Sequence, residues 1–380
     1  MPVVGMVGGG QLARMTAAAA VGLGATFRVL AESPTESAAL VVHDVEVGSH
    51  LSLRKISSFA AKCDVITFDH EHVPEAVLSA LESEGVLVRP GSAALRYTQD
   101  KLAMRERLSA LGVPCPRFAP ASSIDDVERF ACGSWPVVLK AVSGGYDGKG
   151  VWVCGSAAEA RTVLTHGLRL IAEEYVPFER ELAVLAARSP YGQGAVYPVV
   201  QTVQRDGICR EVLAPAPGLA PGLMAQAQAL ALRIAAELDV TGLLAVEMFE
   251  TSRGLLVNEL AMRPHNCGHW TIEGAVTSQF EQHLRAVLDL PLGSPALAAP
   301  VTVMANVLGG DDGDVYDRYI HVMAGDPAVK VHMYGKPARP GRKIGHVTVT
   351  GDRRHRDPAE LADRARRAAS YLRWGKEDGE

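Results

Sequence analysis

Apolar and polar positions alternate in short blocks from Pro2 to Pro90. The expected strands are Val3–Val7, Thr26–Ala31, Val65–Phe68 and Val86–Val88, and the expected helices are Gln11–Leu23, Ile56–Cys63 and Glu75–Leu81. Apolar strands that alternate with helices form parallel sheets covered on both faces. This region therefore predicts an α/β, doubly wound, Rossmann-like domain at 1–97.

The rest of the chain predicts a middle domain, 98–294, and a small strand-rich C-terminal domain, 295–380. A long helix, roughly Ala93–Leu111, is expected to end at Gly112 before a proline-rich junction. A compact block at about 117–178 predicts a small mobile lobe. It has the expected helices Asp125–Ala131 and Ala157–His166 and the expected strands Val137–Ala141, Val151–Cys154 and Leu170–Val176.

The second half of the middle domain reads as strands, a helix and a hairpin. Glu181–Leu213 is rich in strand patterns, Leu223–Leu238 is helical, and Leu243–Glu250 and Gly254–Leu260 flank a turn. A linker, Pro291–Pro300, precedes the C-terminal domain. Its last helix is expected to begin at Asp357, with proline at the first helical position and Glu360 at the third.

Composition limits the class of protein. The 38 Lys+Arg and 43 Asp+Glu residues give a net charge of −5, which argues against nucleic acid and membrane surfaces as partners. The six cysteines form no C-x-x-C pair, so reduced thiols in the cytoplasm are expected. No apolar run approaches the roughly 20 residues that span a bilayer. We expect a soluble cytoplasmic enzyme.

A glycine-rich turn, Gly8–Ala13, follows the first strand and opens a helix. It fits the pattern G-x-G-x-x-A, and Glu32 lies where a dinucleotide fold places its ribose-binding acid. A nicotinamide site is one interpretation. A site for another ligand and a purely structural turn are the others.

A second glycine-rich segment, Ser143–Gly150, is the main candidate for a phosphate loop. It holds Gly144, Gly145, Gly148 and Lys149, and Lys140 precedes it at the end of an apolar strand. Glycines let backbone N–H groups converge on oxyanions. A snorkelling lysine and a plain hairpin are the alternatives, and the absence of G-K-[ST] excludes a Walker loop.

Two carboxylates, Glu247 and Glu259, are expected to face each other on the hairpin strands. Like charges at facing positions repel unless a cation lies between them, so the pair predicts a Mg²⁺ or Mn²⁺ site. Solvated hairpin carboxylates are the alternative. Asn258 would point to the opposite face of a regular strand.

Three further groups carry candidate chemistry. Glu173–Val176 ends a strand as a nucleotide hinge does, with Glu181 nearby for ribose hydroxyls. Arg263–His269 gathers Arg263, His265, Asn266 and His269 as a small-anion pocket; zinc binding by the two histidines is disfavoured by Pro264 and Gly268. The third group is a loop with the four cations Lys336, Arg339, Arg342 and Lys343. A phosphate monoester site or a solvated basic turn would explain it.

These motifs together resemble the ATP-grasp carboxylate–amine ligases, and among them the N5-carboxyaminoimidazole ribonucleotide synthetases of purine biosynthesis. The similarity runs essentially from end to end. The motifs that carry it are Gly8–Leu12, Thr67–Pro74, Gly144–Gly150, Asn258–Asn266 with Gly268–Ile272, Tyr334–Lys336, Arg339–Lys343 and Gly345–Val347.

The resemblance implies an ATP-grasp fold, a homodimer and three substrates: ATP, bicarbonate and 5-aminoimidazole ribonucleotide. It implies that ATP lies against Lys101, Lys140, Ser143, Gly144, Gly145, Gly148, Glu173, Glu174, Val176 and Glu181, with the metal on Glu247 and Glu259. The ribonucleotide would contact Gly10, Gln11, Leu12 and Glu71, with its phosphate on Lys336, Arg339, Arg342 and Lys343. Tyr146, Asp147, Lys149, Arg263, His265 and Asn266 would surround the reacting centre.

Some positions depart from the family pattern, namely Ala13, Asp69, Val151, Met262 and Cys267. None of them removes a charged catalytic group. The expected reaction is phosphorylation of bicarbonate by ATP to carboxyphosphate, followed by attack of the amine on carboxyphosphate or on CO2 released from it. A glycinamide ribonucleotide formyltransferase, a nicotinamide oxidoreductase and a non-catalytic nucleotide sensor are the rival interpretations.

Overall fold

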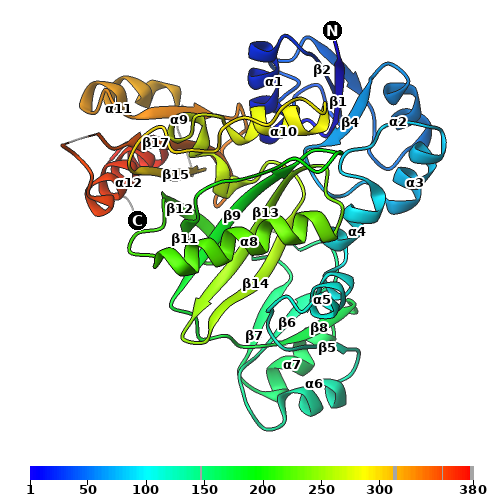
Figure 1. Ribbon diagram of the computed structural model, residues 1–380. Helices are drawn as coiled ribbons and strands as arrows, with labels where there is room; N and C mark the ends of the chain where they lie inside the picture. Colours follow the sequence, from blue (N-terminus) through cyan, green and yellow to red (C-terminus); the bar gives the residue numbers. More distant parts are fainter. Residues whose placement is uncertain (146–147, 311–314, 353, 377–380) are drawn as a thin grey trace.

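The N-terminal part is a parallel sheet in a three-layer arrangement, at the top of the computed structural model (Figure 1). The structure describes residues 1–145, 148–310, 315–352 and 354–376. The strands lie in the order β3-β2-β1-β4, with bounds β1 (Val3–Val7), β2 (Thr26–Ala31), β3 (Asp44–Val47) and β4 (Val65–Phe68). Helix α1 (Gln11–Leu23) packs on one face, and α2 (Leu53–Ala60) and α3 (Glu75–Ser83) pack on the other.

The predicted doubly wound sheet is confirmed, with two corrections. Val86–Val88 forms no strand, because Val88 makes only a single parallel bridge to Ile66. The edge strand β3 was not predicted, since its sequence Asp44–Val47 alternates charged and apolar residues without an apolar run.

The predicted long helix Ala93–Leu111 is two helices, α4 (Ser92–Gln99) and α5 (Lys101–Ala110). Asp100 has an extended backbone between them, and its side chain accepts a hydrogen bond from the Ala103 amide at 2.8 Å. An aspartate that caps a helix competes with continuation of the preceding one. The Lys101 amide donates instead to the Val142 carbonyl at 2.8 Å, which ties this break to the lobe.

The lobe is a separate antiparallel sheet with its own apolar core, at the bottom of Figure 1. Its strand order is β5-β8-β6-β7, with bounds β5 (Phe118–Ala121), β6 (Val137–Ala141), β7 (Val151–Cys154) and β8 (Leu170–Glu174). Helices α6 (Ile124–Ala131) and α7 (Ala157–Leu164) pack on it. Movement of the lobe stays a prediction.

A nine-stranded sheet forms the centre of the molecule, with a main path β14-β13-β9-β11-β12-β15-β17-β16 and β10 paired to β9. The bounds are β9 (Arg180–Arg188), β10 (Gly194–Val196), β11 (Val200–Arg205), β12 (Ile208–Ala214), β13 (Gly242–Thr251), β14 (Gly254–Ala261), β15 (Thr302–Leu308), β16 (Lys330–Met333) and β17 (Lys343–Thr350). The C-terminal strands thus extend the sheet of the middle region through the β12–β15 pairing. The three domain boundaries stay predictions.

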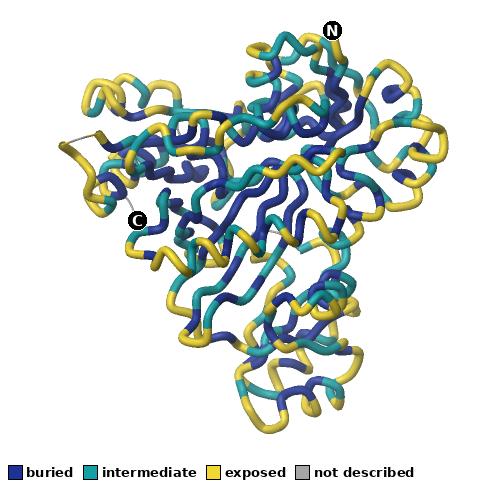
Figure 2. Tube along the Cα trace, viewed as in Figure 1, coloured by how far each residue is buried: buried dark blue, intermediate teal, exposed yellow. Residues whose placement is uncertain are grey.

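Helices cover this sheet along its length. The helical segments are α8 (Pro221–Glu237), η1 (Asn266–Gly268), α9 (Thr271–Gly274), α10 (Gln279–Val287), η2 (Tyr316–Arg318), α11 (Tyr319–Gly325) and α12 (Pro358–Trp374). Helix α12 begins as predicted, with the Asp357 side chain accepting from the Ala359 amide and proline in the first turn. The central strands are buried along most of their length (Figure 2).

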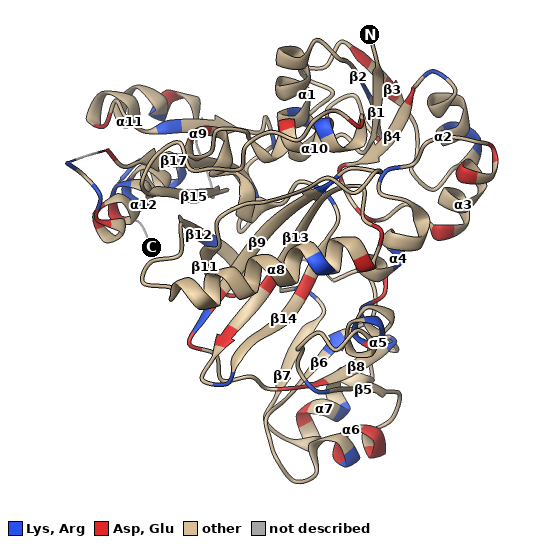
Figure 3. Cartoon of the chain, viewed as in Figure 1, with Lys and Arg blue, Asp and Glu red and all other residues tan. Residues whose placement is uncertain are grey.

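Charged residues of both signs occur in all three parts of the molecule, as the balanced composition predicts (Figure 3). None of the helices in the described part of the chain is both long and apolar enough to cross a membrane.

Candidate active site

One large cleft, about 1480 Å³ in volume, lies where the N-terminal sheet, the lobe, the central sheet and the C-terminal basic loop meet. It brings together every described residue of the predicted site except Gly10 and His269. These residues are Gln11, Leu12, Glu71, Lys101, Lys140, Ser143, Gly144, Gly145, Gly148, Lys149, Glu173, Glu174, Val176, Glu181, Glu247, Glu259, Arg263, His265, Asn266, Lys336, Arg339, Arg342 and Lys343. Tyr146 and Asp147 lie outside the described residues.

The two predicted metal ligands face each other across the hairpin, since Glu247 on β13 pairs with Glu259 on β14. Burial, together with the carboxylates of Glu259 and Glu181, raises the pKa of Glu247 to about 7. Burial also acts on Glu259, but the Lys101 ammonium that binds its carboxylate holds its pKa below the usual value. The pair is a set of hard oxygen donors at facing positions, which suits a divalent cation.

Asn258 corrects the expectation of a regular strand. The β13–β14 register shifts between Glu247 and Met248, so that Asn258 is the extra residue of a β-bulge. Its side-chain oxygen accepts a hydrogen bond from Lys140 Nζ at 2.9 Å, and Asn258 and Glu259 both line the cleft. The bulge therefore directs two successive side chains to the same site.

Lys140 belongs to a buried network of charges beside the glycine loop. Its Nζ atom is 2.8 Å from Glu173 Oε2, and Arg105 Nε donates to Glu173 Oε1 at 2.7 Å. Burial would raise the pKa of Glu173, but Lys140 and Arg105 hold it at about 2. Because the Glu173 carboxylate is occupied in this way, its side chain orients Lys140.

Arg105 was missed by the sequence interpretation. It is fully buried on α5 and donates to the carbonyls of Val257 and Asn258 at 3.0 and 2.7 Å. It thus holds the bulged strand and the Glu173 carboxylate at once. The available signal was one arginine in an amphipathic helix, which does not distinguish a buried residue from an exposed one.

The glycine loop contacts the central sheet. Gly144, Gly148 and Gly150 have φ angles of 79°, 74° and 74°, the left-handed region that glycine adopts without strain. A Cβ atom on Gly148 would lie 2.9 Å from the Gly207 Cα atom in the β11–β12 turn. The loop can therefore approach the hairpin backbone only with glycine at this position.

The first glycine turn is filled by the protein's own carboxylates. Asp69 accepts from the amides of Gly10 and Ala13 at 2.9 and 2.8 Å, and Glu36 accepts from the Gly9 amide at 3.1 Å. The helix N-terminus where a dinucleotide would place its pyrophosphate is thus occupied. This contradicts the nicotinamide interpretation. Gly10 does not line the cleft, and its contact with the ribonucleotide stays a prediction. Glu32, the ribose ligand in the nicotinamide interpretation, instead has its Oε1 atom 2.7 Å from His50 Nδ1.

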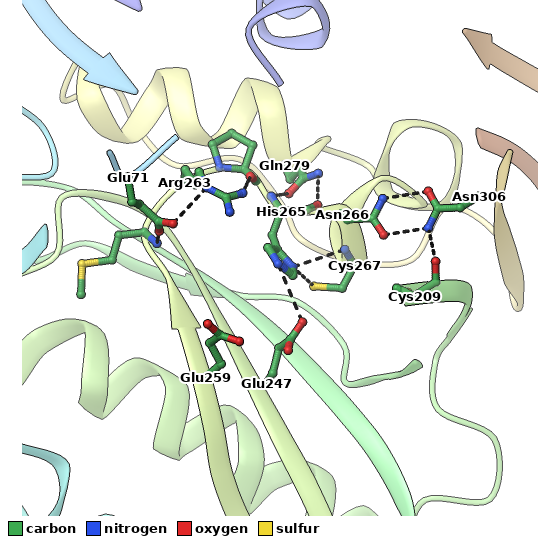
Figure 4. Close-up of polar contacts among 12 residues, drawn as sticks. Glu71, Cys209, Glu247, Glu259, Arg263, His265, Asn266, Cys267, Gln279 and Asn306 are labelled. Atoms are coloured by element: carbon green, nitrogen blue, oxygen red, sulfur yellow. Dashed lines mark hydrogen bonds and ion pairs between the residues drawn. The ribbon is translucent and has the colours of Figure 1, made fainter. Parts of the chain in front are cut away.

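Arg263, His265 and Asn266 line the cleft, and Figure 4 shows their polar contacts. Arg263 Nε donates to Glu71 Oε2 at 3.2 Å, and His265 Nε2 is 3.8 Å from Glu247 Oε1. Burial lowers the pKa of His265 well below its usual value, so the imidazole is neutral. Asn266 exchanges two hydrogen bonds with Asn306, at 2.9 and 2.8 Å.

His269 does not join that segment in the cleft. It is fully buried, stacks on Phe280 and does not line the cleft. Throughout the described ranges no three His, Cys, Asp or Glu side chains form a metal-binding group. The structure therefore gives no support to the zinc interpretation, which the sequence had disfavoured.

The basic loop reaches the N-terminal sheet. The Lys336 ammonium donates to the Gln11 side-chain oxygen and lies 5.9 Å from the centre of the Tyr334 ring. Arg339, Arg342 and Lys343 line the same side of the cleft. A cationic loop against the start of α1 is a candidate anion site at the junction of two parts of the chain.

Three family models match consecutive parts of the chain. They describe a ribonucleotide synthetase preATP-grasp domain at residues 1–99, an ATP-grasp domain at 106–280, and a phosphoribosylaminoimidazole carboxylase C-terminal domain at 302–357. The N5-carboxyaminoimidazole ribonucleotide synthase of Mycobacterium tuberculosis is 54% identical over 384 residues, covering 99% of this chain and 89% of the relative. That of Corynebacterium ammoniagenes is 49% identical, covering 98% and 92%.

The chain belongs to the N5-carboxyaminoimidazole ribonucleotide synthase family. It is an ATP-grasp ligase of purine biosynthesis, as the sequence resemblance indicated. Solved structures agree. The synthetase from Thermus thermophilus superposes with a TM-score of 0.87 at 38% identity, covering 99% of this chain and all of that one. The Aspergillus clavatus synthase, in complex with ADP and 5-aminoimidazole ribonucleotide, has a TM-score of 0.88 at 31% identity, and 98% of each chain is covered.

Proposed function

We propose that this protein carboxylates the amine of 5-aminoimidazole ribonucleotide, using ATP and bicarbonate, through carboxyphosphate. The observation that carries the proposal is one cleft that joins the glycine loop and carboxylate pair to the Arg263–Asn266 segment and the basic loop. The chemistry needs all of these to meet, because a phosphoryl donor, a small anion and a phosphorylated amine must react at one point.

ATP would lie between the lobe and the central sheet. Lys140 and Lys101 supply positive charge at the phosphates, and the backbone at Glu174 and Val176 faces the adenine. Glu181 suits the ribose hydroxyls, since it lines the cleft and its carboxyl oxygens can accept hydrogen bonds from them. The Lys140–Glu173–Arg105 network fixes one ammonium before substrate arrives, which reduces reorganisation in the transition state.

Glu247 and Glu259 would hold Mg²⁺, with Asn258 beside them. The fit rests on the two facing carboxylates, which supply the hard oxygen ligands that Mg²⁺ prefers. A bound divalent ion supplies charge neutralisation at the transferred phosphoryl group. Lys101 would release Glu259 and turn to a phosphate oxygen.

Bicarbonate would lie on Arg263, His265 and Asn266. The resemblance assigns Tyr146, Asp147 and Lys149 of the glycine loop to the same reacting centre. Arg263 provides a fixed guanidinium, because Glu71 holds it on the side away from Glu247. The neutral His265 contributes a hydrogen bond without adding charge. The ribonucleotide would lie on Gln11 and Leu12, with its 5′-phosphate on Lys336, Arg339, Arg342 and Lys343.

The reaction proceeds in two transfers. A bicarbonate oxygen attacks the γ-phosphorus of ATP, and the bond to the β–γ bridging oxygen breaks, which gives ADP and carboxyphosphate. The amine nitrogen then forms a bond to the carboxyl carbon as phosphate leaves, and the nitrogen loses a proton. Lys101, Lys140 and Arg263 counter the negative charge that builds during the first transfer. The homodimer, the cytoplasmic location and the movement of the lobe remain predictions. The six free cysteines support the cytoplasmic location.

ADP formation with each candidate amine tests this proposal. We expect ADP release that requires both bicarbonate and 5-aminoimidazole ribonucleotide, with ¹³C from labelled bicarbonate appearing as a carbamate on the product. Turnover with formate and glycinamide ribonucleotide would instead support the formyltransferase. Nucleotide binding without turnover would support the sensor.

A further inference from the structure

Helix α10 carries two fully buried glutamines that bind distant backbone segments in the same way. Gln279 Oε1 accepts from the His265 amide at 2.9 Å, and its Nε2 donates to the His265 carbonyl at 2.8 Å. Gln282 Oε1 accepts from the Gly293 amide at 2.7 Å, and its Nε2 donates to the Gly293 carbonyl at 2.8 Å. One glutamine therefore fixes a segment in the cleft, and the other fixes the linker before the C-terminal part.

The Gln279 amide is held from several sides. Its backbone amide donates to Thr271 Oγ1 at 2.8 Å, and its Nε2 also lies 3.0 Å from His269 Nδ1. A Cβ atom on Gly268 would lie 2.4 Å from Gln279 Oε1, so the 3-10 turn η1 packs directly on this side chain. Both N–H bonds of the side-chain amide are used, which requires His269 Nδ1 to act as an acceptor and its proton to lie on Nε2.

His265, whose backbone amide and carbonyl are clamped by the two Gln279 hydrogen bonds, is the central residue of the proposed bicarbonate site. His265 lies between Arg263 and Asn266 in sequence, and its imidazole extends from the clamped backbone toward Glu247 (Figure 4). Its Nδ1 atom lies 3.1 Å from Cys267 Sγ and 3.4 Å from the Cys267 amide. The position of the His265 backbone therefore determines where its imidazole and the side chains of Arg263 and Asn266 lie. An error of about 1 Å in such a site is enough to lower a rate by about a hundredfold.

We propose that Gln279 is a positioning residue for carboxylation, which acts by fixing the backbone of His265. The inference rests on the proposed function, since it assigns Gln279 to the half of the reaction that uses bicarbonate. Gln279 does not line the cleft, so its effect is transmitted through His265. ATP binding lies on other elements and is left unchanged.

The matched pair Gln279→Leu and Gln282→Leu tests this assignment. Both remove a fully buried glutamine from the same helix, together with its two hydrogen bonds to the amide and carbonyl of one residue. The His265 carbonyl keeps the Gly268 amide as a donor at 2.9 Å. We expect both variants to lower the Tm by similar amounts. Gln279→Leu should lower kcat/KM for bicarbonate at least tenfold and leave KM for ATP within threefold. Gln282→Leu should leave all kinetic constants within threefold. Equal kinetic losses in the two variants, or a Gln279→Leu enzyme within threefold of wild type, would overturn the proposal.

Gln279→Glu gives a second test if the leucine variant folds poorly. A carboxylate still accepts from the His265 amide but donates to neither the His265 carbonyl nor His269, whereas a protonated carboxyl group restores one donor. We expect kcat/KM for bicarbonate, relative to wild type, to rise as the pH falls. A flat ratio between pH 6 and pH 9 would contradict a role for the donated bond.

Hydrogen exchange separates this inference from the proposed function. Amide exchange at 265–268 should accelerate in Gln279→Leu and stay at the wild-type rate in Gln282→Leu, with no substrate present. Unchanged exchange in both variants would refute the clamp. Absence of bicarbonate-dependent turnover in the wild type would refute the proposed function and leave the exchange result to decide the clamp.

Discussion

Two glycine-rich segments of this protein have similar sequences and opposite uses. The turn at Gly8–Gly10 and the loop at Ser143–Gly150 both follow a strand and both provide backbone N–H groups. In the first, the carboxylates of Asp69 and Glu36 accept those hydrogen bonds. The second borders the cleft, beside Lys140 and the Glu247–Glu259 pair. The comparison teaches that a glycine pattern indicates available donors, whereas the surrounding side chains decide whether the acceptor is a ligand or the chain itself.

Around the loop, charged groups are arranged for a ligand, so their removal should affect turnover more than stability. Glu259→Gln removes a carboxylate from the predicted metal site and should lower kcat about a hundredfold, equivalent to about 2.7 kcal/mol of barrier. Steady-state kinetics with purified protein measure the loss, and circular dichroism checks the fold. Retention of more than about a tenth of the wild-type rate would contradict the metal assignment.

Around the turn at Gly8–Gly10, a substitution should affect stability more than turnover. Asp69→Ala leaves the amides of Gly10 and Ala13 without their acceptor at a helix N-terminus, which should cost about 2 kcal/mol of unfolding free energy. Urea denaturation measures the change. The vacated turn should still bind no NAD, because Glu36 and the other side chains remain; NAD binding by this variant would show that Asp69 alone had closed a dinucleotide site.

The basic loop extends the comparison to the second substrate. Arg342→Ala should raise KM for the ribonucleotide at least about tenfold, or about 1.4 kcal/mol, and leave KM for ATP within about threefold. The dephosphorylated nucleoside is the control, because wild type and variant should handle it almost equally. A variant that loses ATP affinity, or still distinguishes nucleotide from nucleoside as well as wild type does, would place the 5′-phosphate elsewhere.

The smallest predicted effect concerns Glu181, whose burial in the cleft lowers the free energy of unfolding. Burial raises the folded-state pKa of Glu181 to about 7, above its unfolded value, so this group destabilises the fold increasingly as the pH rises from about 4.5 through 7. Glu181→Gln should therefore be about 1 kcal/mol more stable than wild type at pH 8 without nucleotide, and equal to it near pH 4.5. Denaturant titrations at both pH values measure this. A variant less stable at pH 8 would show that the carboxylate is compensated by partners.

The sequence predicted those features that depend on local pattern. The parallel sheet, the lobe strands and the facing positions of Glu247 and Glu259 follow from periodicity and spacing, and the structure has them. It did not predict that Asp69 fills the turn, since that contact joins residues 59 positions apart. The break at Asp100 and the bulge at Asn258 also escaped, because a capping side chain and a buried arginine override the regular pattern there.

The candidate site also divides into residues that the sequence predicted and residues that it did not. Residue types with evident chemistry were found, while those that only hold others in place were not. Arg105, Asn306 and Gln279 have no motif, because their role is defined by buried partners distant in sequence. Such residues emerge only once the packing is known.

Hydrogen exchange at both glycine segments, measured in one experiment with a nonhydrolysable ATP analogue, tests the central claim most directly. Nucleotide that binds beside the loop and excludes water should slow exchange across Ser143–Gly150. It should leave Gly8–Gly10 at the rate of the free protein, because these amides already donate to the Leu30 carbonyl, Glu36 and Asp69, respectively. Slower exchange at Gly8–Gly10 with an unchanged loop would contradict the account and return the nucleotide site to the N-terminal sheet.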